Sequence, residues 1–168
     1  MQEKANPMSD DFKGTPANDR ELVLTLLLDA PRAAIYRCWT EPELMKQWFA
    51  PKPYTTPYVE TDVRPGGASK ITMRSPEGQD MPNPGQWLVV EPNKRLMFTD
   101  AFTGDWQPKE GAPFFVAEIS LSDEGGKTRY IAKARHWTKE NREQHEAMGF
   151  HPGWTTCAKQ LEALARTL

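Results

Sequence analysis

Two kinds of hydrophobic spacing divide this chain. Residues 20–28 and most of residues 58–137 repeat their apolar positions every second residue, which is typical of β-strands. Residues 150–168 repeat them every three or four residues, which indicates a helix with one apolar face. That face contains Trp154, Cys157, Leu161, Leu164 and Leu168. Such a helix needs a large apolar partner, and we expect it to lie on the concave side of an antiparallel sheet.

The strand pattern predicts a meander. The first strand runs from Arg20 to Leu28, and its two apolar faces suggest a strand in the interior of the fold. Further strands are expected at Tyr58–Arg64, Ala68–Arg74, Gln86–Glu91, Arg95–Phe102, Phe114–Ser122 and Thr128–Trp137. Most connections are short, which favours antiparallel neighbours. The polar segments Ser75–Pro84 and Thr103–Pro113 are expected to be loops, and Pro65-Gly66 fits the centre of a type II turn.

Two short helices are predicted after the first strand. Asp29-Ala-Pro31 opens the first helix, because proline suits the first turn. Thr40 and Glu43 have the spacing of a capping box, which predicts a second helix ending at Phe49. Thr138 is expected to cap another brief helix before the long one. Helices gathered on one face of the sheet make the fold class α+β.

The first residues differ in character from the rest of the chain. Residues 1–18 are polar and aperiodic, so we expect a disordered N-terminal arm. The remaining residues, 19–168, are enough for one domain with its own core.

Composition and charge argue against several classes of function. A net charge of −2 gives no general reason to expect nucleic acid or an anionic membrane as a partner. No apolar run is long enough to span a membrane and no signal peptide is evident, so a cytoplasmic location is expected. The two cysteines, Cys38 and Cys157, lack the spacing of a metal clamp or a redox pair, and we expect neither a metal nor a cofactor.

Several motifs, in this order, resemble one protein family. They are Asp29-Ala-Pro31, Thr40-Glu-Pro-Glu-Leu-Met-Lys-Gln-Trp48, Asp62-Val-Arg-Pro-Gly-Gly67, Gly85-Gln-Trp-Leu-Val-Val-Glu-Pro92 with Arg95-Leu96, and His145-Glu-Ala-Met-Gly149 with Gly153-Trp154. Over residues 20–168 the chain is similar to the START-like (SRPBCC) superfamily, and within it to homologues of the activator of the heat-shock-protein-90 ATPase. The resemblance implies a helix-grip fold, a curved antiparallel sheet of six or seven strands around a long C-terminal helix. It also implies a hydrophobic ligand cavity, but no single activity.

Candidate ligand-binding residues lie where the predicted sheet and helix face each other. Large rings and small alanines along these faces can form a cavity wall. The candidates are Trp48, Ile71, Met73, Trp87, Ala117, Ile119, Tyr130, Ala132, His136, Trp154 and Cys157. The alanines can equally let the helix approach closely and close the gap. Trp106, in the long loop, is the candidate for a lid residue.

No catalytic residue is predicted, although His136 has a side chain that can take part in proton transfer. A neutral imidazole on a cavity wall can accept or donate a proton. A structural histidine with satisfied hydrogen bonds is the more frequent case. His145 and His151 are expected at the surface or at helix caps, because their spacing is not that of a metal site.

Three functions follow from these patterns. The first is binding of a hydrophobic or aromatic small molecule without defined catalysis. The second is a polyketide cyclase-like or aromatase-like enzyme that uses His136, Tyr130 or Glu118 as proton shuttles. The third is a chaperone-interaction module, which is least favoured, because co-chaperones of the family carry an additional N-terminal domain that eighteen residues cannot supply. A homodimer stays open.

Overall fold

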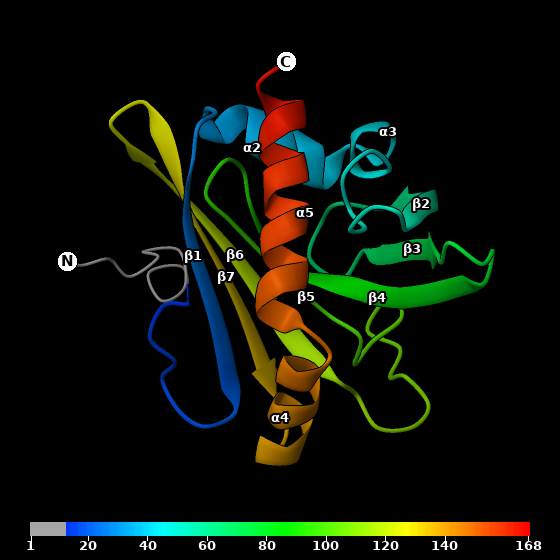
Figure 1. The fold of residues 1–168 in the computed structure, drawn as a ribbon. Coiled ribbons are helices and arrows are strands. Elements are labelled where there is room, and N and C mark those ends of the chain that lie inside the picture. Colours follow the sequence, from blue (N-terminus) through cyan, green and yellow to red (C-terminus); the bar gives the residue numbers. More distant parts are fainter. Residues whose placement is uncertain (1–12) are drawn as a thin grey trace.

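The fold is a curved antiparallel sheet whose concave face is covered by helices (Figure 1). It is described here for residues 13–168 of a computed structural model. The strands are β1 (Glu21–Leu28), β2 (Thr55–Thr61), β3 (Ala68–Arg74), β4 (Asp80–Glu91), β5 (Arg95–Thr99), β6 (Phe115–Glu124) and β7 (Lys127–His136). The helices are α2 (Arg32–Thr40), α3 (Pro42–Met45), α4 (Lys139–Ala147) and α5 (Phe150–Ala165). The predicted α+β helix-grip fold is confirmed.

Sheet order explains where the core lies. The strands follow the order β1-β7-β6-β5-β4-β3-β2, and α5 crosses their concave face (Figure 1). Alternate residues of neighbouring strands meet on that face, because successive side chains of a strand point to opposite sides. Its buried side chains include Leu22, Leu24, Leu26 and Leu28 of β1, Tyr130, Ala132 and Ala134 of β7, and Ala117, Ile119 and Leu121 of β6.

The first strand lies at the edge of the sheet, so the expectation of an interior strand is wrong. β1 pairs with β7 alone. Its outer face carries the apolar residue Val23, which made the strand look as if both faces were covered. Val23 is indeed buried, but by the segment that precedes the strand. A side chain at Gly14 would meet the Val23 Cγ1 atom at 2.5 Å, so residues at this point lie directly on Val23.

Part of the predicted N-terminal arm is described. Residues 13–18 lie beside β1, where the backbone N–H of Ala17 donates to Glu21 Oε1 at 2.8 Å and the Asn18 carbonyl accepts from Glu21 N. Residues 1–12 of the arm lie outside the described residues. The boundary between arm and domain stays a prediction.

The two short helices after β1 lie where they were predicted, but the residues that begin and end them differ from the prediction. Thr40 is the last residue of α2, and its hydroxyl donates to the Tyr36 carbonyl. The predicted capping box is therefore wrong, and α3 begins at Pro42 after Glu41, with no side-chain cap. Proline at the first helical position needs no partner for a missing N–H. The predicted cap of α4 is present, since Thr138 accepts from the backbone N–H of Asn141 at 3.0 Å.

The segment predicted as a loop before the fourth strand is partly strand. β4 starts at Asp80, and Pro82 and Pro84 pair with β3 residues. Only β3 pairs with this part, because the pairing with β5 begins at Gln86. Proline is tolerated in a strand where its missing N–H faces no partner. The polar, proline-rich composition therefore hid six residues of strand before Gln86.

The long helix buries a different set of residues from the predicted stripe. Its most buried side chains are Phe150, Ala158, Leu161 and Ala165, all at 1 % exposure or less. Trp154, Cys157 and Leu164 are half-buried, and Leu168 lies beyond the helix with 47 % exposure, so its place in the predicted stripe is wrong. The deepest contact line of α5 therefore passes through Ala158 and Leu161 and only beside Trp154 and Leu164.

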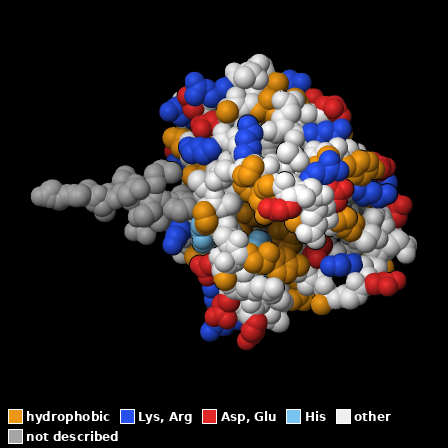
Figure 2. Space-filling model, turned by 45° about the vertical axis from the view of Figure 1, so that its right-hand side comes forward, with side chains coloured by type: hydrophobic (Ala, Val, Ile, Leu, Met, Phe, Trp, Pro, Cys, Tyr) orange, Lys and Arg blue, Asp and Glu red, His pale blue; other side chains and the backbone are white. Residues whose placement is uncertain are grey.

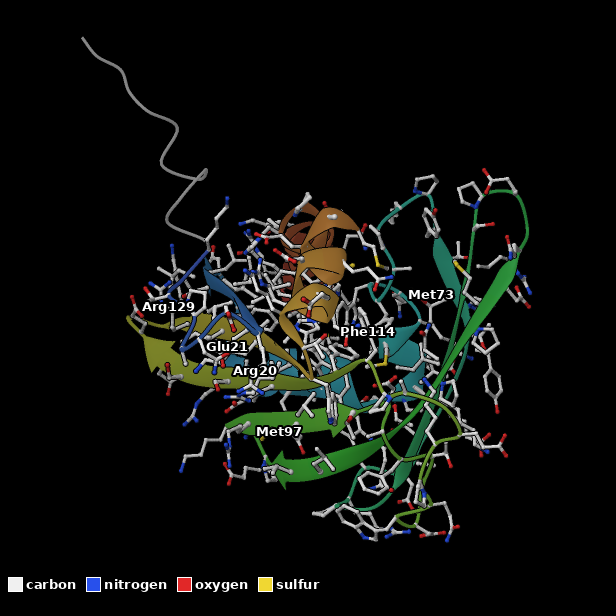
Figure 3. The ribbon with its side chains drawn as sticks, turned by 90° about the horizontal axis from the view of Figure 1, so that it is seen from below. Arg20, Glu21, Met73, Met97, Phe114 and Arg129 are labelled. Carbon is white, nitrogen blue, oxygen red and sulfur yellow. The ribbon has the colours of Figure 1, made fainter. Side chains whose placement is uncertain are left out.

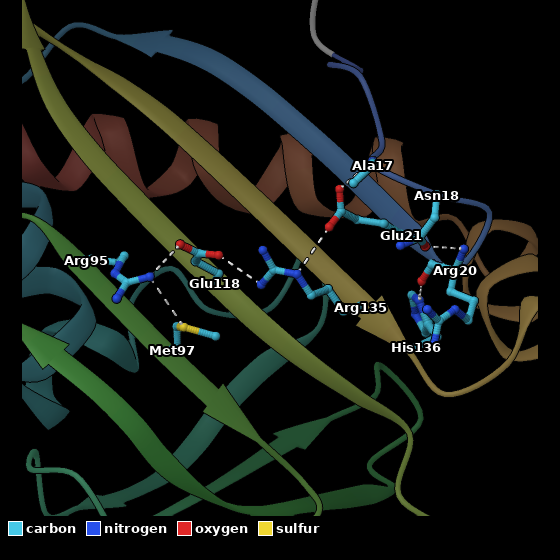
Figure 4. Close-up of polar contacts among 9 residues, drawn as sticks. All are labelled: Ala17, Asn18, Arg20, Glu21, Arg95, Met97, Glu118, Arg135 and His136. Carbon is cyan, nitrogen blue, oxygen red and sulfur yellow. Dashed lines mark hydrogen bonds and ion pairs between the residues drawn. The ribbon is translucent and has the colours of Figure 1, made fainter.

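A chain of ion pairs crosses the convex face of the sheet (Figure 4). Glu118 of β6 contacts Arg95 at 3.2 Å and Arg135 at 2.8 Å, and Arg135 also contacts Glu21 at 3.1 Å. Glu118 and Glu21 are buried, at 8 % and 5 % exposure. Burial alone raises the pKa of Glu118, but hydrogen bonds from the two arginines outweigh it and lower that pKa. The chain ties β5, β6, β7 and β1 together.

Candidate functional site

The helix and the sheet enclose a small apolar cavity. Its volume is about 60 Å³, well below the roughly 300–1,000 Å³ of typical ligand pockets. It is lined by Trp39, Trp48, Phe49, Phe98, Tyr130, Trp154, Cys157 and Ala158. Figure 2 shows a hollow with hydrophobic side chains on the side of the molecule where this wall lies. The wall is mostly aromatic, so it suits flat apolar molecules.

Most polar atoms of this wall are hydrogen-bonded within the protein, but the indole N–H of Trp154 has no acceptor among the described residues. The indole N–H of Trp48 donates to the Cys38 carbonyl at 2.9 Å, and Cys157 donates to the Phe49 carbonyl. The Tyr130 hydroxyl oxygen accepts from Trp39 Nε1 at 3.1 Å. Within residues 13–168 nothing accepts the hydrogen of that hydroxyl. A tyrosine O–H both donates and accepts, so Tyr130 has a donor to offer to a ligand.

Burial keeps the thiol and the phenol of the cavity wall in their neutral, unreactive forms. It raises the pKa of the Cys157 thiol to about 12, so the reactive thiolate is absent at neutral pH. It also raises the pKa of Tyr130. Both groups are therefore neutral, and neither is activated as a nucleophile or a base.

A second apolar cavity of about 70 Å³ lies on the other side of Phe98. It is lined by Ser69, Ile71, Asn83, Pro84, Gly85, Gln86, Phe98, Thr99, Asp100 and Phe115. Ser69 is buried, at 7 % exposure, yet its hydroxyl bonds to no residue in the described part of the chain. The Asp100 carboxylate is occupied, because it accepts from the backbone N–H groups of Phe114 and Phe115 and contacts Lys109. The side-chain Nε2 of Gln86, which also lines this cavity, is buried and has no hydrogen-bond partner among the described residues either.

Larger hollows lie on the outside of the helical layer. One, of about 590 Å³, runs along the outer side of α5 beside Lys52 and Lys159. A neighbouring one of about 520 Å³ lies between α3 and β2. Their walls are mainly lysine, glutamine and threonine side chains open to solvent. Size alone does not make them the functional site, since a small-molecule pocket excludes water from most of its ligand.

His136 and His145 form a buried hydrogen-bonded pair at the end of β7. His136 Nδ1 lies 2.9 Å from the Arg20 carbonyl oxygen, and its Nε2 lies 2.9 Å from His145 Nδ1. A carbonyl can only accept, so His136 carries its hydrogen on Nδ1, and His145 then donates from its own Nδ1. Both rings are neutral in this arrangement. The pair joins α4 to β7 and to the segment before β1.

The surroundings of His145 contradict its predicted surface position. It is buried at 8 % exposure, and its ring centroid lies 4.9 Å from Phe114 and 5.2 Å from Phe150. Burial, together with the nearby His136, lowers the pKa of His145 to about 4, and burial lowers the pKa of His136 as well. Its place on a polar helix hid this contact, because α4 buries only that one side chain.

The structure distributes the predicted ligand-binding residues over five places. Trp48, Tyr130, Trp154 and Cys157 line the first cavity, and Ile71 lines the second. Trp87, Ala117, Ile119 and Ala132 are core residues that line neither, each at 1 % exposure or less. His136 belongs to the histidine pair. Met73 lies on β3, away from α5 (Figure 3).

Sequence reasoning missed four residues of the first cavity wall and misjudged one loop residue. The missed residues are Trp39, Phe49, Phe98 and Ala158. Trp39 and Ala158 could have been found from helical spacing relative to Ile35 and Leu161. The lid candidate Trp106 lines neither cavity, and its ring lies against Gly66 and 5.6 Å from Phe102.

Residues 13–168 contain neither a metal-ligand cluster nor a membrane-spanning helix. No three histidine, cysteine, aspartate or glutamate side chains of these residues lie together as metal ligands would. None of their helices combines the length and apolar character that crossing a membrane requires.

The model of the family described as Activator of Hsp90 ATPase homolog 1-like protein matches residues 29–166. No curated protein matches the chain.

Solved structures share the fold over nearly the whole chain. A protein from Nitrosomonas europaea is 40% identical with a TM-score of 0.86, and the match covers 91% of this chain and 97% of that one. The AHSA1-like protein from Aeromonas hydrophila is 17% identical with a TM-score of 0.67, covering 88% and 92%. CalU16 from Micromonospora echinospora is 18% identical with a TM-score of 0.58, covering 86% and 75%. The last two support the fold alone.

Proposed function

The chain belongs to the Activator of Hsp90 ATPase homolog 1-like family, and from that membership we propose that it binds a small hydrophobic or aromatic molecule between α5 and the sheet. The observation that carries the proposal is the aromatic cavity at this position. Trp39, Trp48 and Trp154 come from three different segments and converge on one space. Apolar pockets with a few polar groups are the usual form of small-molecule sites.

The cavity in this structure corresponds to a closed state. About 60 Å³ is too little for a molecule with even one substituted ring, so entry of a ligand requires side chains to move. Binding then selects an open conformation, and its measured affinity includes the cost of opening. The half-buried wall residues Phe49, Phe98 and Trp154 have more freedom to move than the fully buried ones.

Binding without catalysis fits the described side chains better than an enzyme of the cyclase or aromatase kind. Of the proton shuttles considered, Tyr130 has a raised pKa and stays neutral. Glu118 lies on the opposite face of the sheet and is held by Arg95 and Arg135. His136 donates to a backbone carbonyl and accepts from His145. None of them presents a free base to the cavity.

A neutral environment-sensitive dye, N-phenyl-1-naphthylamine, tests the proposal. We expect saturable binding near one site per chain, and we expect Ala158→Leu to weaken it at least fivefold, because Ala158 lines the cavity. Ala163→Leu is the matched control, since it adds the same atoms to an exposed position of α5. Absence of saturable binding, or equal affinity in both variants, would rule out a ligand site in this cavity.

A further inference from the structure

We infer that Phe98 is a gate that divides one ligand site into two halves, and that the ligand is a planar aromatic molecule bearing an oxygen group. This inference rests on the proposed function and adds the chemical class of the ligand. It starts from a single shared residue. Phe98 is the only side chain among the described residues that lines both apolar cavities, the one beside Tyr130 and the one beside Ser69.

The phenyl ring of Phe98 acts as the partition. Its centroid lies 5.6 Å from that of Trp39, on the side of the first cavity, and 6.3 Å from that of Phe115, on the side of the second. The two cavities measure about 60 and 70 Å³, so neither holds an aromatic ligand alone. When the ring turns away, both spaces and the volume of the ring itself become one cleft.

Phe98 is less buried than its strand neighbours, although the ring of Trp87 packs edge-on against it with centroids 5.6 Å apart. It is half-buried, whereas its partners Trp87 on β4 and Ala117 on β6 are fully buried. Ala117 is small and does not fix the ring. The pairing of β4 with β5 shifts register between Trp87 and Val89, directly beside Phe98. Such irregularities are common next to functional sites, where they change the direction of a side chain.

The polar groups of the joined cleft define the ligand chemistry. Among the described residues, the O–H of Tyr130 has no acceptor in the first half, and the Ser69 hydroxyl and the buried Gln86 Nε2 have no partner in the second. All three groups are neutral, so a charged ligand gains no ion pair from them. An acceptor oxygen on an aromatic framework, as in a phenol, aryl ketone or quinone, satisfies a donor that otherwise stays unpaired.

Phe98 variants test the gate by calorimetric titration with 2-naphthol. Phe98→Leu removes the ring, so we expect the affinity to rise at least threefold, because the cost of opening falls. Phe98→Trp enlarges the partition, and we expect the affinity to fall at least threefold. Phe102→Leu is the matched control, since Phe102 packs on Trp106 outside both cavities. Unchanged affinity in both Phe98 variants would overturn the gate. Should Phe98→Leu fail to fold, Phe98→Met takes its place with the same expected result.

Tyr130→Phe and Ser69→Ala test the ligand class, with naphthalene beside 2-naphthol as the pair of probes. We expect the wild-type protein to prefer 2-naphthol, and at least one variant to lose about two- to tenfold of that preference, as expected for one hydrogen bond. Equal binding of the two probes by the wild-type protein would overturn the oxygen requirement. If the wild-type protein binds neither probe nor N-phenyl-1-naphthylamine, the proposed function itself fails. If the wild-type protein binds these probes but the Phe98 variants bind 2-naphthol with unchanged affinity, only the gate is refuted.

Discussion

Single residues with buried charge hold the convex face of this protein. Glu118 is the centre of that arrangement, because it contacts arginines from both neighbouring strands. We expect Glu118→Ala to lower the free energy of unfolding by about 1.5–3 kcal/mol, the range for hydrogen bonds to charged groups. The arginines are partly exposed and can recover water, which keeps the loss below that of a fully buried pair.

Urea denaturation at pH 7 measures this loss. Glu124→Ala is the control, since Glu124 also pairs with an arginine but is exposed, and such pairs contribute about 0–1 kcal/mol. Equal effects of the two substitutions would show that burial adds nothing at Glu118.

The histidine pair makes stability depend on pH. Its rings have lowered pKa values in the folded state, about 4 for His145, whereas an unfolded histidine titrates near 6.5. Between these values the unfolded chain binds more protons, so we expect the free energy of unfolding to decrease as pH falls from about 6.5 towards 4. Above pH 7 the two histidines should no longer make the free energy of unfolding depend on pH.

Denaturation midpoints in urea between pH 4.5 and 8 show this dependence. His145→Gln should be less stable than the wild-type protein at pH 8, because His136 Nε2 loses its donor. The difference should narrow as pH falls. A wild-type protein whose midpoint is as high at pH 5 as at pH 7 would contradict the buried neutral pair.

At the level of elements, α5 is the longest helix and lies across the concave face of the sheet. Leu161 is completely buried in the middle of this helix and lines neither apolar cavity. We expect Leu161→Ala to destabilise the protein by about 2–5 kcal/mol, the range for truncating a buried leucine. Thermal or urea unfolding measures it, and Leu164→Ala, at a half-buried position, should cost less. The reverse order would mean that the helix packs through its other side.

Periodicity predicted the elements better than their ends. Alternating leucines identified β1, and the spacing around Leu161 identified α5, because both patterns arise from one buried face. Thr40 misled the prediction because a hydroxyl can bond backward to a carbonyl as easily as cap the next helix. The edge position of β1 could not be predicted, since Val23 is buried by a segment without any pattern.

Candidate site residues were predictable where they belong to regular elements. Trp48, Tyr130, Trp154 and Cys157 meet because their elements pack together. The role of Phe98 was hidden, because its pattern marks it only as an inward residue of a short strand. Contacts of His145 with Phe114 and Phe150 depend on how α4 turns back on the sheet, and local sequence does not determine that turn.

For the molecule as a whole, an open sheet of seven strands has two free edges, and solubility depends on how these are protected. Residues 80–85 add a third exposed row of backbone groups, because β4 pairs only with β3 there. Pro82 and Pro84 remove two N–H groups from that stretch, and Pro57 removes another from the edge strand β2. A strand without these donors is a poor template for another chain. The prolines that made residues 80–85 look like a loop in the sequence thus protect the protein against aggregation through this strand.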